Sequence, residues 1–320
     1  MPNITDAPPE FVAKELQALS ADLDRVIPAK KLDNNLLVAT WNIRAFGDLT
    51  EQWTQVTAGS PKRNLHALSC IAEIVSRFDV IGIQEVRGNL KCLRDMLRAL
   101  GPHWSFVMTD VTRGDRGNNE RMAFVFDTRK VGLSGLACEL VVPEDQDIGE
   151  NAFARQFART PYAVAFKTGG QTFILVTLHI YYGAGPEDRI KELKAIAQWL
   201  SDWAEEEDAW DHDLIALGDF NIDRIDDPLY RAFTSTGLFT PPELNNVPRT
   251  IFSEPGGEDD EKFYDQIAWF ANDEGKPKLS MRYGAAGSFD FTKTVMTSLS
   301  EQSLSWRISD HYPLWVEFLL

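Results

Sequence analysis

The most constraining feature of the sequence is an apolar run that ends abruptly in polar residues. The run 214–217 is followed directly by Gly218, Asp219, Phe220 and Asn221. A strand that carries an acid and an amide to the edge of a sheet would have this pattern. A strand that ends in a tight turn would use the same letters, because Gly, Asp and Asn are common turn residues. Taken alone, the stretch favours the turn.

Several other apolar runs also have polar residues at their ends, and this repetition favours a functional interpretation. Ends of different strands can converge on one edge of a sheet core, which is where α/β proteins build their sites. We therefore expect the polar strand ends to meet at a single site. The residues concerned are Asn42, Glu85, His179, Asp219, Asn221, Asp265, Asp310 and His311.

Some of these residues also have a structural interpretation. Asn42 could pair with neighbouring backbone groups, which is the usual fate of a buried amide. Glu85 could form an ion pair with Arg87, because an unpaired acid at the end of a buried strand is costly. A single histidine beside a core, such as His179, is more often structural than catalytic. Spacing alone does not decide between these alternatives.

Apolar periodicity and turn residues predict alternating helices and strands. The sequence Thr168-Gly169-Gly170 between two strands predicts a hairpin. Polar or proline-rich segments at 110–120, 143–155 and 239–262 are expected to be loops. Helices are expected over residues 11–27, 63–78, 89–100, 186–207 and 227–236. Strands are expected over 36–43, 79–85, 105–109, 122–126, 162–166, 171–178, 214–217 and 263–270, with a closing strand after 311.

With 320 residues and 44% apolar content, the chain can bury a large core, and it fits one large α/β domain as well as two smaller ones. No segment has the unbroken apolar length needed to cross a bilayer, and residues 1–35 lack the basic-then-apolar order of a signal peptide.

Cys70, Cys92 and Cys138 are widely spaced and are expected to be free thiols. We therefore expect a cytoplasmic protein, and no protein partner is evident.

The polar strand ends suit metal-assisted attack on a phosphate. Glu85, Asp310 and the amide of Asn42 offer the hard oxygen ligands that Mg²⁺ prefers. His311 beside an acid is a common arrangement for a general base. No cluster rich in Cys or His indicates a tight zinc site. The net charge of −16 repels nucleic acid at long range, so a polyanionic substrate would need a local basic patch or a metal.

Seven short motifs follow one another along the chain. They are Trp41-Asn42-Ile43-Arg44, Ile83-Gln84-Glu85-Val86-Arg87, Phe157-Ala158-Arg159-Thr160-Pro161, Leu178-His179, Gly218-Asp219-Phe220-Asn221, Tyr264-Asp265-Gln266-Ile267 and Ser309-Asp310-His311-Tyr312-Pro313. In these motifs the chain resembles the endonuclease/exonuclease/phosphatase superfamily over about residues 36–320, and within it the DNase I-like nucleases. Each motif is weak alone, but chance does not account for seven in the family's order. Residues 284–291 also resemble the segment before the last motif in that branch.

The resemblance implies a four-layer α/β sandwich, in which two mixed β-sheets pack face to face between flanking helices. It implies a catalytic domain over residues 36–320, preceded by a helical extension over residues 1–35. It also implies that Glu85 is the main Mg²⁺ ligand, with Asn42 and Asp310 as further ligands. Mn²⁺ would substitute for Mg²⁺, and a structural Ca²⁺ site is left open.

The resemblance further implies two histidine–carboxylate pairs with different roles. His311, oriented by Asp265, would act as general base. His179, paired with Glu120, would act as general acid or stabilise the charge that develops on the phosphate.

The remaining implied roles concern the water, the phosphate and the substrate backbone. Asp219 and Asn221 would lie near a second metal position or the attacking water. Arg159 would donate to a phosphate oxygen, because a planar guanidinium suits that partner. Arg44 and Arg87 would contact the nucleic-acid backbone, where contacts position the duplex without reading its sequence.

These features predict a Mg²⁺-dependent phosphodiesterase, a DNA endonuclease of DNase I type that leaves a 5′-phosphate. A phosphomonoesterase or a phospholipid or phosphoinositide head-group hydrolase of the same superfamily is the alternative. A catalytically silent binding module is disfavoured, because every catalytic position is filled. One departure is Gly117-Asn118-Asn119, which stands where DNase I has an aromatic residue before the Glu120 position. Arg113, Arg116 and Arg121 could form a compensating basic patch.

Overall fold

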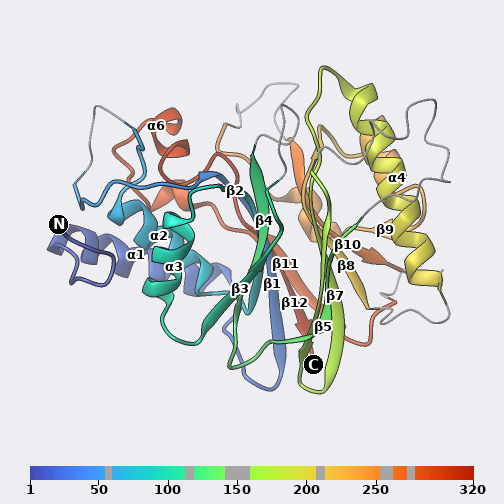
Figure 1. Cartoon of the computed structure of the whole chain (residues 1–320), viewed down its shortest axis with the longest axis horizontal. Coiled ribbons are helices and arrows are strands. Elements are labelled where there is room, and N and C mark those ends of the chain that lie inside the picture. Colours follow the sequence, from blue (N-terminus) through green and yellow to red (C-terminus); the bar gives the residue numbers. More distant parts are fainter. Residues whose placement is uncertain (55–59, 112–118, 141–158, 207–212, 253–261, 272–277) are drawn as a thin grey trace.

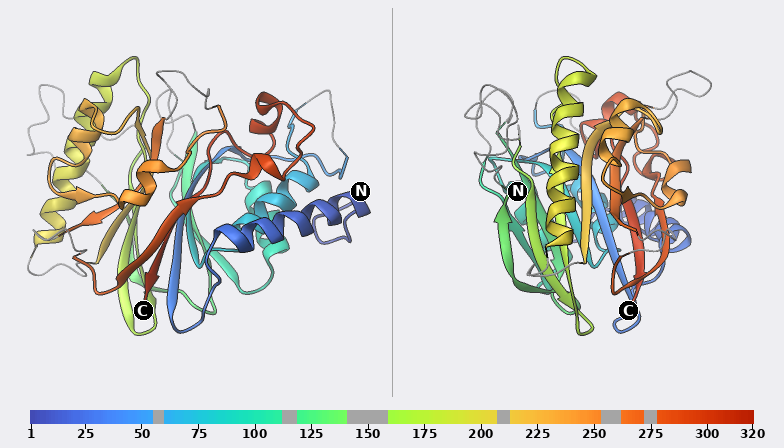
Figure 2. Two further views of the ribbon diagram at one scale, coloured as in Figure 1. Left: turned by 180° about the vertical axis from the view of Figure 1, so that it is seen from behind. Right: turned by 90° about the vertical axis from the view of Figure 1, so that its right-hand side faces the viewer.

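Two mixed six-stranded sheets pack face to face, and helices cover the outer face of each (Figure 1, Figure 2). The computed structural model describes residues 1–54, 60–111, 119–140, 159–206, 213–252, 262–271 and 278–320. The predicted four-layer α/β sandwich is confirmed.

The first sheet has the strand order β11-β12-β1-β2-β4-β3. Its central strands β1 and β2 are parallel, and the other neighbours run antiparallel. Both central strands are buried along most of their length, as their continuous apolar runs predict. The strands are β1 (Asn35–Phe46), β2 (Val80–Arg87), β3 (Trp104–Met108), β4 (Glu120–Asp127), β11 (Arg282–Ser288) and β12 (Leu314–Leu319).

The second sheet has the strand order β5-β6-β7-β8-β10-β9, with β7 and β8 parallel. The predicted hairpin joins β6 and β7, and Gly169 and Gly170 at its turn have φ of 53° and 83°. A two-residue turn of this kind needs positive φ, which glycine adopts without strain. The strands are β5 (Gly132–Glu139), β6 (Tyr162–Thr168), β7 (Gln171–His179), β8 (Leu214–Ile222), β9 (Leu238–Phe239) and β10 (Phe263–Phe270).

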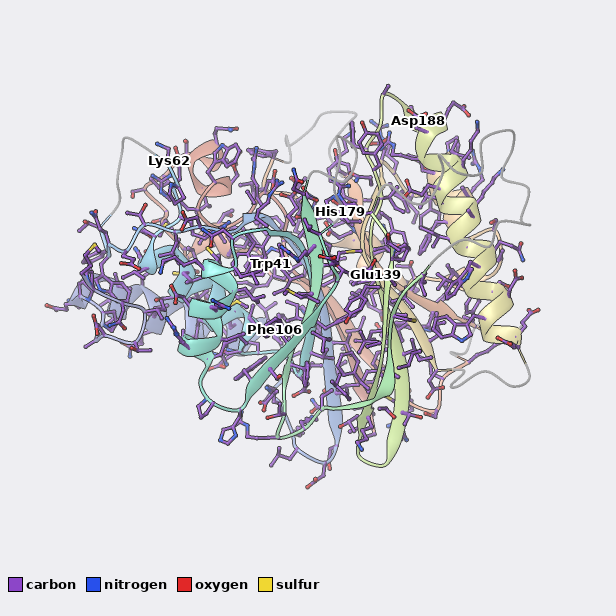
Figure 3. The ribbon with its side chains drawn as sticks, in the orientation of Figure 1. Trp41, Lys62, Phe106, Glu139, His179 and Asp188 are labelled. Atoms are coloured by element: carbon purple, nitrogen blue, oxygen red, sulfur yellow. The ribbon has the colours of Figure 1, made fainter. Side chains whose placement is uncertain are left out.

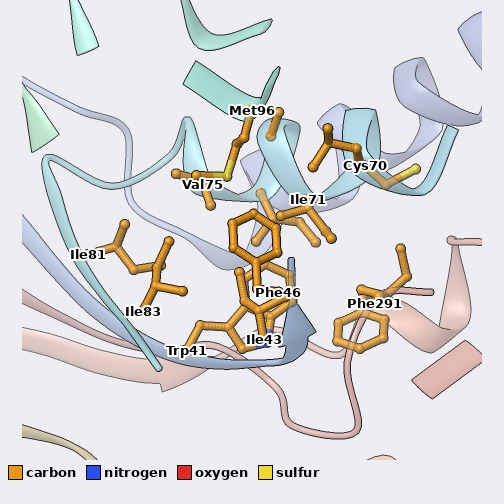
Figure 4. Close-up of a cluster of buried hydrophobic side chains, with 14 of the residues drawn as sticks. Trp41, Ile43, Phe46, Cys70, Ile71, Val75, Ile81, Ile83, Met96 and Phe291 are labelled. Atoms are coloured by element: carbon orange, nitrogen blue, oxygen red, sulfur yellow. The ribbon is translucent and has the colours of Figure 1, made fainter. Parts of the chain in front are cut away.

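Three apolar layers hold the sandwich together. Phe46, Ile71 and Met96 belong to the layer between the first sheet and its helices (Figure 4). Phe124 and Trp269 belong to the layer between the sheets, and the third layer lies between the second sheet and α4. The helices are α1 (Glu10–Val26), α2 (Leu65–Val75), α3 (Lys91–Leu100), α4 (Pro186–Glu205), α5 (Pro228–Phe233) and α6 (Glu301–Ser305), with the 3₁₀ helices η2 (Pro242–Asn246) and η3 (Phe291–Lys293).

The structure corrects several expectations about local structure. The strand after 214 does not end at Leu217, because β8 continues to Ile222, so the turn interpretation is wrong. Strands β5 and β11 were not predicted, and the expected loop over 239–262 contains η2 and the end of β9. The predicted loop at 143–155, the glycine at 117 and the arginines at 113 and 116 lie outside the described residues.

The N-terminal helix α1 packs on α2, with Leu19 and Leu23 in the same apolar layer as the first sheet. The division between an extension over 1–35 and a catalytic domain stays a proposal. Cys70 and Cys92 are buried free thiols, as expected, and Cys138 is half-buried. None of the described helices has the length and apolar character needed to span a membrane.

Candidate active site

The polar strand ends lie in two rows, one on each sheet, at the same rim of the sandwich. In the second sheet, His179, Asp219 and Asp265 are register partners on the neighbouring strands β7, β8 and β10. In the first sheet, Asn42 on β1 is the register partner of Gln84 on β2. Figure 3 shows His179 between the sheets near their upper rim. The fold thus brings together residues that are far apart in the sequence.

Irregular backbone at this rim redirects Glu85. The pairing of β2 with β4 shifts register around Glu85, whose φ is 60°, and β1 has a similar irregularity at Ala45, whose φ is 47°. A non-glycine residue with positive φ costs about 1–3 kcal/mol, and such strain and bulges are common next to functional sites. As a result, the backbone N–H of Ala45 donates to Glu85 Oε2 at 2.8 Å and fixes the carboxylate.

Gly218 lets β8 approach β7 where His179 and Asp219 meet. Its φ is 141°, and a Cβ atom at this position would lie 2.1 Å from the carbonyl oxygen of Leu178. Further along β8, Asn221 has a φ of 49°, and its side chain donates to the Ile180 carbonyl oxygen at 2.6 Å. The polar stretch that ends the apolar run is therefore a strained continuation of the strand.

His311 and Asp265 form a histidine–carboxylate pair in which the His311 side chain is 12% exposed. Nδ1 of His311 lies 2.6 Å from Asp265 Oδ2, and Asp265 is fully buried. Burial raises the pKa of Asp265 to about 6. Burial alone would lower the pKa of His311, but the charges of Asp265, Asp219 and Asp310 raise it to about 10. The carboxylate therefore orients the ring and stabilises the imidazolium, so the ring must lose its Nε2 proton before it can act as a base.

His179 and Glu120 form a second pair, which bridges the two sheets. Nδ1 of His179 lies 3.2 Å from Glu120 Oε2, and its Nε2 lies 3.5 Å from Asp219 Oδ2. Glu120 also pairs with Arg159 Nε at 2.8 Å and with Arg87 Nη2 at 3.3 Å. Burial opposes the ionisation of Glu120, but His179 and the two arginines outweigh it and lower the Glu120 pKa. Glu120 therefore remains a carboxylate.

Asn42 links the sheets through a carboxylate. Its Nδ2 donates to Asp219 Oδ2 at 2.9 Å, and Asp219 Oδ1 accepts from the backbone N–H of Asn221 at 2.9 Å. Asn42 Oδ1 is buried without a hydrogen-bond partner among the described residues. The amide thus does not simply pair with neighbouring backbone groups, which was the structural alternative for this residue.

Glu85 and Asp310 are the more exposed acids of the site, with side chains 20% and 24% exposed. Arg87 Nη2 lies 3.4 Å from Glu85 Oε2, so the ion pair considered for Glu85 is present. Arg44 Nη1 lies 3.1 Å from Asp310 Oδ2, and its guanidinium stacks 3.8 Å from the ring centre of the exposed Trp306. Both acids are therefore reachable from solvent, and each has an arginine beside it.

The oxygen atoms around Asn42 fit a hard divalent cation. A buried amide oxygen without a donor is costly, and a cation would satisfy Oδ1. Two acids are held close to Asn42. Glu85 directly follows Gln84, the register partner of Asn42. Asp310 directly follows Ser309, whose hydroxyl donates to the Asn42 carbonyl oxygen at 2.6 Å. Two carboxylates and one amide are a donor set typical of Mg²⁺, which takes few protein ligands. The ligand assignment itself stays a prediction.

Sequence reasoning missed two residues that hold this site together. The buried hydroxyl of Ser309 also accepts from the backbone N–H of His311 at 3.2 Å, which ties the His311 loop to β1. Arg189 Nη1 donates to the Asn221 carbonyl oxygen at 2.7 Å. Ser309 stands inside a motif, which could have pointed to it. Arg189 lies on α4, and no sequence pattern connects it with Asn221.

Sequence comparisons relate the chain to nucleases along most of its length. The model of the Endonuclease/Exonuclease/phosphatase family matches residues 39–311. A protein named deoxyribonuclease from Thioalkalivibrio sp. (strain K90mix) is 27% identical over 300 residues, which cover 89% of this chain and 71% of that protein. Deoxyribonuclease-1 from Bos taurus is 26% identical over 299 residues, covering 89% of this chain and 93% of that protein.

Solved structures show the same fold at lower identity. The mannosyl-6-phosphatase of Bacteroides thetaiotaomicron gives a TM-score of 0.57 at 20% identity, covering 89% of this chain and 100% of that chain. The catalytic domain of human Nocturnin gives 0.58 at 17% identity, covering 89% and 95%. The family match spans every predicted site residue from Asn42 to His311. The chain therefore belongs to the endonuclease/exonuclease/phosphatase family and is a hydrolase.

Proposed function

We propose that this hydrolase is a metal-dependent phosphodiesterase that cuts DNA internally and leaves 5′-phosphate ends. The observation that carries the proposal is that two histidine–carboxylate contacts lie at one rim. Asp265–His311 is separated by 2.6 Å and Glu120–His179 by 3.2 Å. The names of the sequence relatives, which are deoxyribonucleases, support DNA as the substrate.

Glu85, Asn42 and Asp310 would hold the divalent cation, Mg²⁺ or in its place Mn²⁺. When bound, the cation supplies positive charge that attracts a phosphate group. Without it, the net charge of −16 of the protein would repel that group. Arg159 and Arg87 sit beside the buried Glu120, so much of their charge is compensated within the protein. The cation is therefore expected to be essential for binding a polyanion here.

The side chains divide the proton transfers between them. Nδ1 of His311 is held by Asp265, so Nε2 is the atom that accepts the proton of the attacking water. The water oxygen bonds to phosphorus, and the bond from phosphorus to the 3′ oxygen breaks. His179 donates a proton to that leaving oxygen, which becomes a 3′ hydroxyl. Asp219 lies in register between His179 and Asp265 and would orient the water.

Arg44 extends the site along the substrate backbone. Its guanidinium is 23% exposed, pairs with Asp310 and stacks on Trp306, so it is fixed in place before substrate arrives. A planar guanidinium held in this way suits contact with a phosphate neighbouring the one that is cut.

Nicking of supercoiled plasmid by the pure full chain tests the proposal. We expect nicked circles with Mg²⁺ or Mn²⁺, none with EDTA, and nicks that DNA ligase reseals because they carry 5′-phosphate and 3′-hydroxyl ends. His311→Ala and His179→Ala should each lower the rate about 10²–10⁴-fold. His103→Ala is the matched control, because His103 is exposed and precedes β3 at the opposite end of the first sheet.

A parallel panel of RNA, abasic duplex, phosphoinositide and sugar phosphate separates the alternatives. Turnover of a phosphomonoester or a phosphoinositide without any DNA cutting would replace the nuclease proposal by the corresponding phosphatase. Absence of turnover on every substrate, together with partner binding that His311→Ala weakens, would instead indicate a binding module.

A further inference from the structure

Glu15, His66 and Cys70 meet where α1 packs on α2, outside the site described above. Glu15 Oε1 lies 2.8 Å from His66 Nε2 and 3.6 Å from Cys70 Sγ. One ligand atom from each residue lies within 4.8 Å of the other two. Cys70 and His66 are 0% and 4% exposed, and the Glu15 side chain is 21% exposed. The three groups form a small polar cluster that opens to solvent on the Glu15 side.

The fold holds these three side chains in place before any ligand binds. His66 and Cys70 are four residues apart on α2 and therefore lie on one face of that helix. The ring of Phe11 packs edge-on against the His66 ring at 5.6 Å. Figure 4 shows the Cys70 sulfur pointing away from Phe46 and the inner part of the apolar cluster.

The hydrogen bonds within the cluster leave part of its polarity unmatched. A single oxygen of Glu15 serves both partners, and His66 Nδ1 is buried without a partner among the described residues. Burial of polar groups that are incompletely paired is costly.

We propose that Glu15, His66 and Cys70 bind a divalent transition metal of the zinc class, with water in a fourth position. Carboxylate oxygen, imidazole nitrogen and thiolate sulfur are the usual protein ligands of Zn²⁺, and thiolate disfavours Mg²⁺ and Ca²⁺. One carboxylate and one thiolate balance the charge of the ion. Binding releases the Cys70 proton to solvent, so affinity falls as pH is lowered.

The site would fasten the N-terminal helix to the sandwich, because one ligand comes from α1 and two come from α2. It is not visible in the sequence, since Glu15 precedes His66 by 51 positions. No local cluster rich in Cys or His indicates a zinc site in the sequence, because the three proposed ligands come from two helices.

Cobalt binding to the full chain, with Mg²⁺ in large excess to occupy oxygen-only sites, tests this inference. We expect one equivalent of Co²⁺ to produce a sulfur-to-cobalt charge-transfer band in the near ultraviolet, and one equivalent of Zn²⁺ to remove it. Cys70→Ser should abolish the band. Cys138→Ser is the matched control and should keep it, since Cys138 lies on β5 in the second sheet.

Glu15→Gln keeps the inference testable if Cys70→Ser fails to fold, because Glu15 is partly exposed. It should weaken Zn²⁺ binding at least about tenfold, as loss of a metal-site group usually does. Zn²⁺ should also slow proteolysis within residues 1–35 in wild type but not in Cys70→Ser. Absence of the band in wild type, or a band that survives Cys70→Ser, would overturn the inference.

Discussion

Replacing Asp265 by Asn isolates the contribution of one carboxylate to the proposed reaction. Asn has nearly the same shape, so β10 should keep its place in the sheet. Its amide group can donate to Nδ1 of His311, whereas the carboxylate only accepts. The proton of the neutral ring would then move to Nε2, and Nε2 could no longer accept a proton from water.

The expected loss follows from the geometry of the pair. The contact is a charge-assisted hydrogen bond of 2.6 Å at a fully buried carboxylate, so solvent does not screen it. Loss of a positioned proton acceptor costs about 10²–10⁴-fold in rate, equivalent to about 2.7–5.4 kcal/mol in the activation barrier. We therefore expect kcat to fall about 10³-fold. KM should stay within about threefold, because Asp265 touches no substrate in this account.

Steady-state cleavage of a fluorogenic duplex with saturating Mg²⁺ measures both parameters. Asp127→Asn is the matched control, since Asp127 is a buried acid at the far end of β4 from Glu120 and pairs with Lys30 and Arg129. Its kcat at 25 °C should equal that of wild type. A kcat for Asp265→Asn within threefold of wild type would refute the reasoning, and so would an equal loss in the control.

Three further predictions concern stability and substrate binding. Asp127→Asn should lower the free energy of unfolding by about 2–3 kcal/mol at pH 7. Although burial opposes it, the hydrogen bonds from Arg129 and Lys30 lower the Asp127 pKa, so this stabilisation is present above the unfolded-state pKa of about 3.9 and declines at lower pH. Urea unfolding should show a smaller difference in the free energy of unfolding between wild type and Asp127→Asn at pH 3 than at pH 7. An equal difference at both pH values would contradict the role of the ionised Asp127. Gly218→Ala should destabilise by at least about 2 kcal/mol in the same assay, because its Cβ would meet the Leu178 carbonyl oxygen. Arg44→Ala should raise KM for DNA. It should also reduce the slope of the logarithm of the binding constant against the logarithm of the salt concentration by about one. An unchanged slope would show that Arg44 does not contact the DNA backbone.

The sequence predicts the central strands and the edge strand β3 well, but it does not predict the edge strands β5 and β11. β1 and β2 are buried on both faces, so their residues form continuous apolar runs that stand out. β5 and β11 contain Gly135 and Gly284, and their residues alternate between exposed and half-buried positions. Edge strands of this composition carry no strong apolar pattern, and only their pairing with β6 and β12 defines them.

The same limit applies to the site. Strand-end position correctly indicated that residues such as His179 and Asp219 would meet, because the parallel neighbours β7 and β8 bring their ends to one edge. The partners of Glu120 depend instead on how the two sheets pack against each other, which no local sequence pattern encodes. The positive φ of Glu85 and the requirement for glycine at Gly218 are also properties of bulges and close approach, which only the folded chain reveals.

The most direct test of the central claim compares the single and double histidine variants. If His179 and His311 serve one phosphodiester at one rim, the two changes should not act independently. We predict that His179→Ala/His311→Ala cuts plasmid in Mg²⁺ at a rate close to that of the slower single variant, as for residues that act as a unit. Losses that multiply fully in the double variant, or a near-normal rate in either single variant, would contradict the claim.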